Sequence, residues 1–421
     1  MKMEARLKSG ILWNIAGFGV TALLGMVTNI VVMLYGSSDI LGMYNQLTAY
    51  YAVLGQLASC GMQQAGIYFL ARAKNKDDEG RIAGSMLSCS AVAGVAAALF
   101  LYLSAGALGR YIYRDPAMAA GIRAVAAAAV PFGINKCILG ILNAYRQMEK
   151  FSVLQMMKYV IILLTVLTAV YWQRFYEYGI YCFLAAEMLT LILGIFCVRK
   201  AVKVKMPRFS IIKKQFVFGS KAVVGGVVNQ LNTKVDILVL GIFCSNDIVG
   251  IYSFGAMLAE GVLTILFVIR ANINPILAQL LKAGQTERLS QWINQLQKYS
   301  RLAAFGFQGV IMAGYYILCY LMQKPAYLKG AFPLLILLTG ISIAAPQILK
   351  GNMMTLSGRP QADSKITVAV VFTNIVCNVL LVQRFKMTGV AAATAFSYGV
   401  YIVLVEGFLR RYGICADNKQ K

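Results

Sequence analysis

The feature that most constrains this chain is a series of long apolar stretches separated by short charged or glycine-containing breaks. A run of about 20 apolar residues is long enough to cross the hydrocarbon core of a bilayer as a helix. Of the 421 residues, 59% are hydrophobic and only 13% are charged, which is more apolar surface than a soluble chain could keep from water. We therefore predict an all-α polytopic membrane protein with about twelve transmembrane helices, at residues 11–34, 42–70, 82–107, 118–142, 151–172, 179–198, 216–243, 248–279, 302–322, 331–356, 366–383 and 388–409.

The distribution of lysine and arginine predicts how the chain is oriented. Loops on the side of the two termini hold 26 of these residues, whereas the opposite loops hold 7. Loops on the cytoplasmic side of a membrane are enriched in lysine and arginine, so we expect both termini to be cytoplasmic. The location that fits is the bacterial cytoplasmic (inner) membrane, with a multi-pass chain. The net charge of +24 is then a signal of topology and of attraction to anionic lipids, and we expect no nucleic acid partner.

Two short motifs recur about 210 residues apart. Residues 37–44 (SSDILGMY) match residues 245–252 (SNDIVGIY) at five of eight positions, and Gln173-Arg174-Phe175 with Gly179 matches Gln383-Arg384-Phe385 with Gly389. Because each half holds an even number of spans, the halves are predicted to be parallel repeats. We expect an N-terminal six-helix lobe at 1–198, a cytoplasmic basic linker at 199–215 and a C-terminal six-helix lobe at 216–421.

Two cytoplasmic segments have their own predictions. The basic run 199–214 (RKAVKVKMPRFSIIKK) is interpreted as a solvated linker. Residues 286–301 place apolar side chains at helical spacing among charged ones, which predicts a short helix at the membrane surface ahead of the span at 302–322.

Several kinds of chemistry are disfavoured. The chain has no histidine, which removes the commonest general base and the commonest ligand of transition metals. Its nine cysteines occur singly, mostly within apolar runs, as expected of packing residues. We expect no catalytic residue, no metal site and no cofactor, and therefore not an enzyme.

Ionisable residues inside the spans are the best candidates for function, because a charge in a bilayer costs several kcal/mol unless it faces a cavity or a partner. Glu187 and Glu260 come near the middle of their spans, and Lys158, Lys234 and Asp236 lie a quarter to a third of the way in. Lys234 and Asp236 are two positions apart, so they point to nearly opposite faces of a helix. Five further basic residues are closer to span edges: Arg123, Lys136, Lys221, Arg270 and Lys350.

Uncharged polar residues gather in the first, second and seventh spans. Asn14, Asn229 and Asn232 belong to this group. Such residues are expected where helices line a water-filled central cavity between the two repeats. Hydrogen bonding between helices is the alternative explanation for part of them.

With these residues in view, the chain resembles the polysaccharide-export flippases of the multidrug/oligosaccharidyl-lipid/polysaccharide (MOP) transporter superfamily. The points of similarity are Asp236 and Gly241 leading into Asn246-Asp247-Ile248-Val249-Gly250-Ile251-Tyr252, the counterpart Leu41-Gly42-x-Tyr44, and Gly179 and Gly389, which open the sixth and twelfth spans. The likeness covers the whole chain. It implies twelve helices in two lobes around a V-shaped central cavity, and movement of lipid-diphosphate-linked oligosaccharides from the inner to the outer leaflet.

A diphosphate head group needs a hydrated cavity with positive charge. The candidates for that charge are Lys158, Lys234, Lys136, Lys350, Arg123 and Arg270. Glu187, Asp236 and Glu260 are candidates for pairing with them or for coupling to Na⁺ or H⁺, and the sequence leaves open whether an ion is coupled. The resemblance also implies a polyprenyl-diphosphate-linked glycan as ligand, with a polysaccharide polymerase and glycosyltransferases as partners.

Three alternatives stay open. A cation-coupled multidrug or metabolite exporter of the same superfamily would need clustered acidic residues, whereas seven basic groups inside the spans outnumber the three deep carboxylates. A membrane-bound glycan ligase would need a sizeable external loop with catalytic groups, and the external loops are short. A non-transporting scaffold would have no use for a polar cavity.

Overall fold

A computed structural model describes residues 2–199, 201–283 and 285–412. Part of the basic charge counted above lies outside this description: Lys200, Lys419, Lys421 and the side chains of Lys2, Arg6 and Lys8. All regular elements of the described residues are helices, which confirms the predicted all-α fold.

The chain forms two compact units, Met1–Leu231 and Asn232–Lys421, and the boundary falls inside helix α9. The first unit contains α1 (Lys2–Tyr35), α2 (Ser38–Ser59), α3 (Met62–Leu70), α4 (Lys76–Ala107), η1 (Leu108–Tyr113), α5 (Pro116–Ala127), α6 (Ala129–Ala144), α7 (Met148–Tyr171), η2 (Gly179–Tyr181), α8 (Cys182–Arg199) and the first part of α9 (Phe209–Phe243). The second unit contains the rest of α9, α10 (Asn246–Lys282), α11 (Thr286–Leu321), η3 (Pro325–Gly330), α12 (Ala331–Lys350), α13 (Met353–Leu356) and α14 (Pro360–Arg411).

Ten segments of the described chain are long and apolar enough to cross a membrane. Two features of the structure explain why this number is smaller than the twelve predicted spans. Helix α14 counts once but has non-helical backbone at Lys386 (φ 47°, ψ −129°), between the predicted spans 366–383 and 388–409. The predicted span 42–70 is absent from the ten because α2 carries several polar residues, including the buried Asn45 and Gln46.

Two predicted spans are broken helices. Cys60 (φ 47°) and Gly61 (φ 65°) both have left-handed backbone and separate α2 from α3. The span at 118–142 is interrupted at Ala128, three residues before Pro131, because proline has no N–H to donate to the preceding turn. Each of these two predicted spans is therefore made of two helices.

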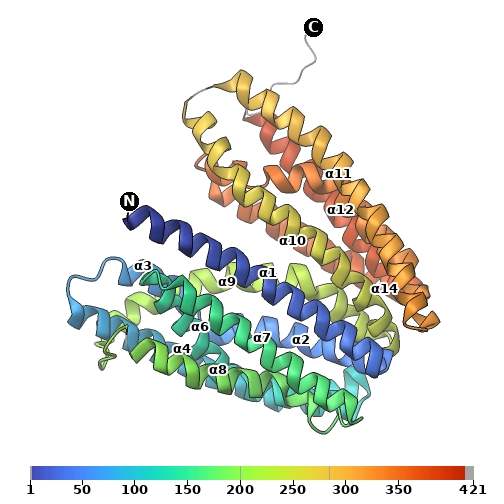
Figure 1. Cartoon of the computed structure of the whole chain (residues 1–421), viewed down its shortest axis with the longest axis horizontal. Coiled ribbons are helices and arrows are strands. Elements are labelled where there is room, and N and C mark those ends of the chain that lie inside the picture. Colours follow the sequence, from blue (N-terminus) through green and yellow to red (C-terminus); the bar gives the residue numbers. More distant parts are fainter. Residues whose placement is uncertain (1, 200, 284, 413–421) are drawn as a thin grey trace. The chain divides into compact units, whose positions relative to one another are not determined.

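Each unit is built around one central span. Helix α6 packs on α2, α4 and α8, and α12 packs on α10, α11 and α14 (Figure 1). These are corresponding helices of the two predicted repeats. The spans that contain α6 and α12 are 78% and 72% buried, whereas none of the other eight exceeds 50%. Pro131 and Pro346 lie in these two central helices.

The glycines of one repeated motif both lie where a side chain would collide with its surroundings. A Cβ added at Gly179 would lie 2.3 Å from the Phe175 ring, whereas one added at Gly389 would lie 2.4 Å from the Leu381 carbonyl oxygen and 3.0 Å from Cβ of Phe385. Each glycine thus allows a close approach, to an aromatic ring in the first unit and to backbone in the second. In the first unit Tyr176 also donates a hydrogen bond to Asp39 (2.6 Å), and burial, together with this bond, raises the pKa of Tyr176.

The predicted surface helix at 286–301 is not separate from the next span. It forms the first half of α11, a single helix of 36 residues. At 1.5 Å per residue α11 is roughly 54 Å long, well beyond the hydrocarbon thickness of about 30 Å. Leu289 and Ile293 are buried against Leu277, Met353 and Leu409 of the same unit. Trp292 and Tyr299 of the same predicted apolar face are 39% and 63% exposed, so only part of that face packs on protein.

The turn at Gly61 gives a test of the fold. A Cβ there would combine a left-handed backbone with a distance of 2.2 Å to the Gly219 carbonyl oxygen. We expect Gly61→Ala to destabilise the protein by at least about 1 kcal/mol and to lower its melting temperature in detergent. Gly19→Ala is the matched control, because a Cβ at Gly19 meets nothing within 4 Å. Equal melting temperatures for the two variants would contradict the packing described here.

Candidate functional site

A buried carboxylate forms the centre of the first unit. Glu187 on α8 has no exposed surface. Its Oε1 accepts a hydrogen bond from the Tyr51 hydroxyl on α2, and its Oε2 accepts one from Asn135 Nδ2 on α6. Asn135 Nδ2 also donates to the backbone oxygen of Glu187 (2.9 Å), and Lys158 Nζ on α7 lies 3.5 Å from Oε1. Residues on three other helices therefore stabilise the negative charge of Glu187.

Aromatic rings enclose the lysine of this ion pair. Lys158 Nζ lies 5.1 Å from the centroid of the Phe132 ring and 5.9 Å from that of Tyr51. Tyr51 in turn packs at 4.5 Å from both the Phe132 and the Phe183 rings. The position of Phe132 depends on Gly55, where an added Cβ would lie 1.1 Å from the ring. We call Tyr51, Phe132, Asn135, Lys136, Lys158 and Glu187 the first-unit cluster.

Lys136 is the second cation of the first-unit cluster. It is half-buried on α6, and its Nζ lies 5.5 Å from the centroid of the same Phe132 ring. The ring is thus shared by two ammonium groups, of which only Lys158 is paired with Glu187. No carboxylate of the described residues lies within 4.0 Å of Lys136 Nζ. The cluster carries two positive charges and one negative charge.

The second unit contains a different arrangement on α9 and α10. Lys234 Nζ lies 2.7 Å from Oε1 and 2.9 Å from Oε2 of Glu260. Asp236 accepts a hydrogen bond from the Tyr252 hydroxyl (2.7 Å) and another from the Ile237 backbone N–H (2.8 Å). The lysine and the aspartate thus have separate partners, as their spacing on the helix requires. We call Lys234, Asp236, Tyr252 and Glu260 the second-unit cluster.

Exposure differs between the two ion pairs. The side chains of Lys158 and Glu187 are 13% and 0% exposed, whereas those of Lys234 and Glu260 are 18% and 39% exposed. The first pair is thus more buried than the second, and Glu260 is the more accessible of the two carboxylates.

The remaining candidates belong to neither cluster. Lys350 is buried (1% exposed), and Arg270 donates a long hydrogen bond (3.5 Å) to the Ile348 carbonyl from a position over the Phe267 ring. Arg123 is exposed and lies over the Tyr102 ring. Asn14 is half-buried, and Asn229 and Asn232 are exposed.

Four residues of the two clusters were not predicted from the sequence as site residues: Tyr51, Phe132, Asn135 and Tyr252. A weak signal existed for two of them, since Asn135 directly precedes Lys136 and Tyr51 lies one heptad after Tyr44. Tyr44 and Tyr51 both pack on the Phe183 ring. Among the uncharged polar residues, Asn45 Nδ2 on α2 donates a hydrogen bond to Asn29 Oδ1 on α1 (2.8 Å). For these two residues the contact supports hydrogen bonding between helices, the alternative to lining a water-filled cavity.

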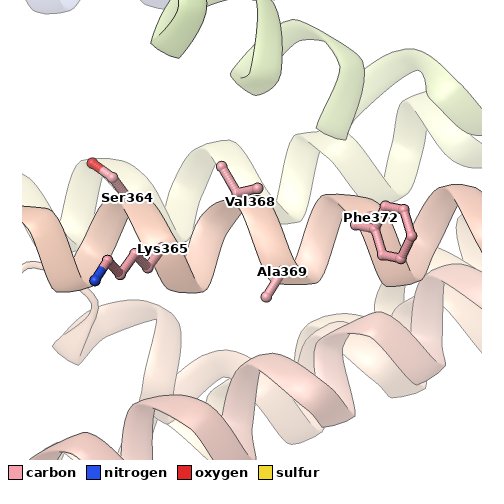
Figure 2. Close-up of a pocket in the computed structure, with 5 residues that line it drawn as sticks. All are labelled: Ser364, Lys365, Val368, Ala369 and Phe372. Carbon is pink, nitrogen blue, oxygen red and sulfur yellow. The ribbon is translucent and has the colours of Figure 1, made fainter.

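A separate hollow lies on the exposed face of α14. Its volume is about 480 Å³, and Figure 2 shows its lining: Ser364, Lys365, Val368, Ala369 and Phe372. None of these residues belongs to either cluster, and none was a predicted site residue.

Comparison with known proteins identifies the family. The family model described as "Polysaccharide biosynthesis protein" matches residues 7–281. A curated relative, the "Probable low-salt glycan biosynthesis flippase Agl15" of Haloferax volcanii, is 23% identical over 236 residues, which are 55% of this chain and 49% of the relative. The "Uncharacterized membrane protein MJ1068" of Methanocaldococcus jannaschii is 23% identical over 240 residues, 54% of this chain and 46% of that protein. The chain thus spans about half the length of the curated relatives it matches.

Solved structures show the same fold. An inward-facing multidrug-resistance MATE family transporter of the MOP superfamily superposes with a TM-score of 0.79, over 94% of this chain and 95% of that chain, at 14% identity. The lipid II flippase MurJ in an inward closed conformation superposes with a TM-score of 0.73, over 95% and 87% of the two chains, also at 14% identity. With more than half of its residues matched by the family model, this multi-pass membrane protein belongs to the polysaccharide biosynthesis protein family and has the fold of the MOP transporters.

Proposed function

We propose that this protein flips an anionic, lipid-diphosphate-linked oligosaccharide from the inner to the outer leaflet by alternating access, for the assembly of a surface polysaccharide. Membership of the family supports a glycan substrate, and so does the description of the Haloferax relative as a probable glycan biosynthesis flippase. We further propose that the membrane is the cytoplasmic membrane of a bacterium, with both termini in the cytoplasm. The excess of lysine and arginine in the loops on the side of the termini supports this orientation.

The observation that carries the proposal is the positive charge left over in the first-unit cluster. Glu187 accepts hydrogen bonds from Tyr51 and Asn135 and pairs with Lys158, and its single negative charge cannot offset the charges of both Lys158 and Lys136. A half-buried ammonium group that shares an aromatic ring with a second cation attracts an anion strongly, because the surrounding apolar helices screen charge poorly. Lys136 is therefore our choice for the group that meets the diphosphate.

Lys158 has a different role in this proposal. The sequence grouped it with Lys234 as a substrate contact, but its charge is countered by a fully buried carboxylate. We assign Lys158 and Glu187 the task of holding α2, α6, α7 and α8 together around Lys136. In the second unit Lys234 is likewise paired with Glu260.

A cation-coupled exporter is the second candidate function, and one observation favours it. The second-unit cluster has two carboxylates, Asp236 and Glu260, for one ammonium group, Lys234. If transport is coupled to Na⁺ or H⁺, these carboxylates are the groups we assign to that ion. Transport in either form would be the work of a carrier rather than of an enzyme, and a glycan polymerase and glycosyltransferases are the partners that the flippase proposal implies.

The proposal is tested by measuring in which leaflet the lipid-linked glycan accumulates. A strain that lacks this protein should accumulate lipid-linked glycan in the cytoplasmic leaflet. Complementation with Lys136→Gln should restore surface polysaccharide at least about tenfold less well than the wild type, since a charge-assisted contact contributes roughly 1.5–3 kcal/mol. Lys136→Arg, which keeps the charge, is the matched control and should restore export. Full export with Lys136→Gln would contradict the role of Lys136, and the absence of any accumulated glycan would favour the exporter.

The role of Lys158 is tested by a double-mutant cycle. Lys158→Met leaves Glu187 buried and unpaired, which should destabilise the protein by about 3 kcal/mol, and Glu187→Gln should destabilise it similarly. The variant with both changes should recover most of the lost stability and of the export. Recovered stability without export would show that Lys158 contacts the substrate, contrary to our assignment. Melting temperature and surface polysaccharide are the two readouts.

A further inference from the structure

The segment between the two predicted lobes has contacts that the proposed function does not use. Residues 201–208 join α8 to α9. The side chains of Lys203, Val204, Met206 and Arg208 are exposed, as expected of a solvated linker. The backbone of the same segment, however, lies directly on helix α4.

Two glycines one turn apart on α4 make this contact possible. A Cβ added at Gly80 would lie 2.3 Å from the carbonyl oxygen of Lys203, and one added at Gly84 would lie 2.0 Å from that of Lys205. Both collisions involve backbone atoms, which cannot move aside as the end of a side chain can. The Lys205 N–H also donates to the Gly80 carbonyl oxygen (3.0 Å). The segment therefore occupies a groove that only glycine leaves open.

Side chains hold the segment at both of its ends. Val202 is 6% exposed and belongs to the same core cluster as Ile82 of α4. Lys205 Nζ pairs with Oδ1 of Asp77, whose Oδ2 accepts a hydrogen bond from Arg81 Nε (2.7 Å). The Lys205–Asp77 pair is about half exposed (51% and 42%), so water screens it and it contributes little. The backbone contact and Val202 are the stronger attachments.

The first part of α9 continues this attachment to the first unit. Gln215 Nε2 donates to the carbonyl oxygen of Ile82 (3.4 Å), and the Phe218 ring stacks on Tyr68 at 4.9 Å. Further along, a Cβ added at Gly219 would lie 2.4 Å from the Cys60 carbonyl oxygen. Contacts with the first unit thus occur both in the segment and in the first part of α9, from Val202 to Gly219.

We propose that residues 202–207 are a docked strap, seated on Gly80 and Gly84, which holds the first part of α9 on the first unit. The connection between the two repeats is then a fixed element up to α9, not a free linker. This inference does not depend on what the protein transports.

Limited proteolysis of the intact protein in detergent tests the strap. Trypsin cleaves after Lys203, Lys205 and Arg208, and docking should protect these bonds. Gly84→Leu should raise the rate of cleavage in this segment at least tenfold, whereas Gly106→Leu on the same helix should leave it unchanged. A Cβ at Gly106 meets only Arg123, at 3.5 Å. Asp77→Asn should raise the rate no more than about fivefold, because it removes only a screened ion pair. Equal rates for the two leucine variants would overturn the proposal.

Hydrogen exchange of the wild-type protein provides a test that needs no variant. The amide of Lys205 should exchange at least tenfold more slowly than that of Met206, because only the former bonds to Gly80. Equal exchange of the two amides would overturn the proposal, whether or not Gly84→Leu folds.

Discussion

The interaction on which the first unit depends is the burial of one negative charge, that of Glu187. An isolated carboxylate inside an apolar bundle is unfavourable by many kcal/mol, so its neighbours must supply donors and a countercharge. Tyr51, Asn135 and Lys158 do so from three other helices. These contacts join α2, α6, α7 and α8 around the carboxylate, and beside them no carboxylate of the described residues lies within 4.0 Å of Lys136 Nζ. The charge of Glu187 therefore bears both on the packing of these four helices and on the proposed recognition of an anion.

The two units have corresponding helices but different clusters of charged residues. Corresponding helices surround α6 and α12, and a glycine of the repeated motif allows a close approach in each unit, which fits duplication of one six-helix unit. The charges do not follow the repeat, since Lys234 and Glu260 align with Met26 and Ala52 at the offset of 208. The first-unit cluster has an excess of positive charge, and the second-unit cluster has an excess of carboxylates. This asymmetry, rather than the repeated turns, is where we expect the functions of the two units to differ.

Much of the fold could be predicted from the sequence, because span length, the distribution of basic residues and the internal repeat are local or periodic signals. The breaks within helices were harder to predict. Left-handed backbone at Cys60 has no signature in the residue itself, and the continuity of α11 depends on packing around Leu289 and Ile293. The first-unit cluster could not be assembled from spacing, since its members come from four helices. Depth estimated from span ends placed Lys136 near an edge, whereas its shared contact with Phe132 places it beside Lys158.

The most direct test of the central claim, that an excess cation in the first unit serves an anionic lipid substrate, is a flipping assay with purified protein in liposomes. The probe would be a fluorescent, short-chain polyprenyl diphosphate sugar, whose inner-leaflet fraction is protected from a membrane-impermeant quencher. The account predicts that wild-type protein makes this probe accessible at least tenfold faster than protein-free liposomes do, and that it does not move a lipophilic cationic dye. Movement of the dye without movement of the lipid diphosphate would contradict it.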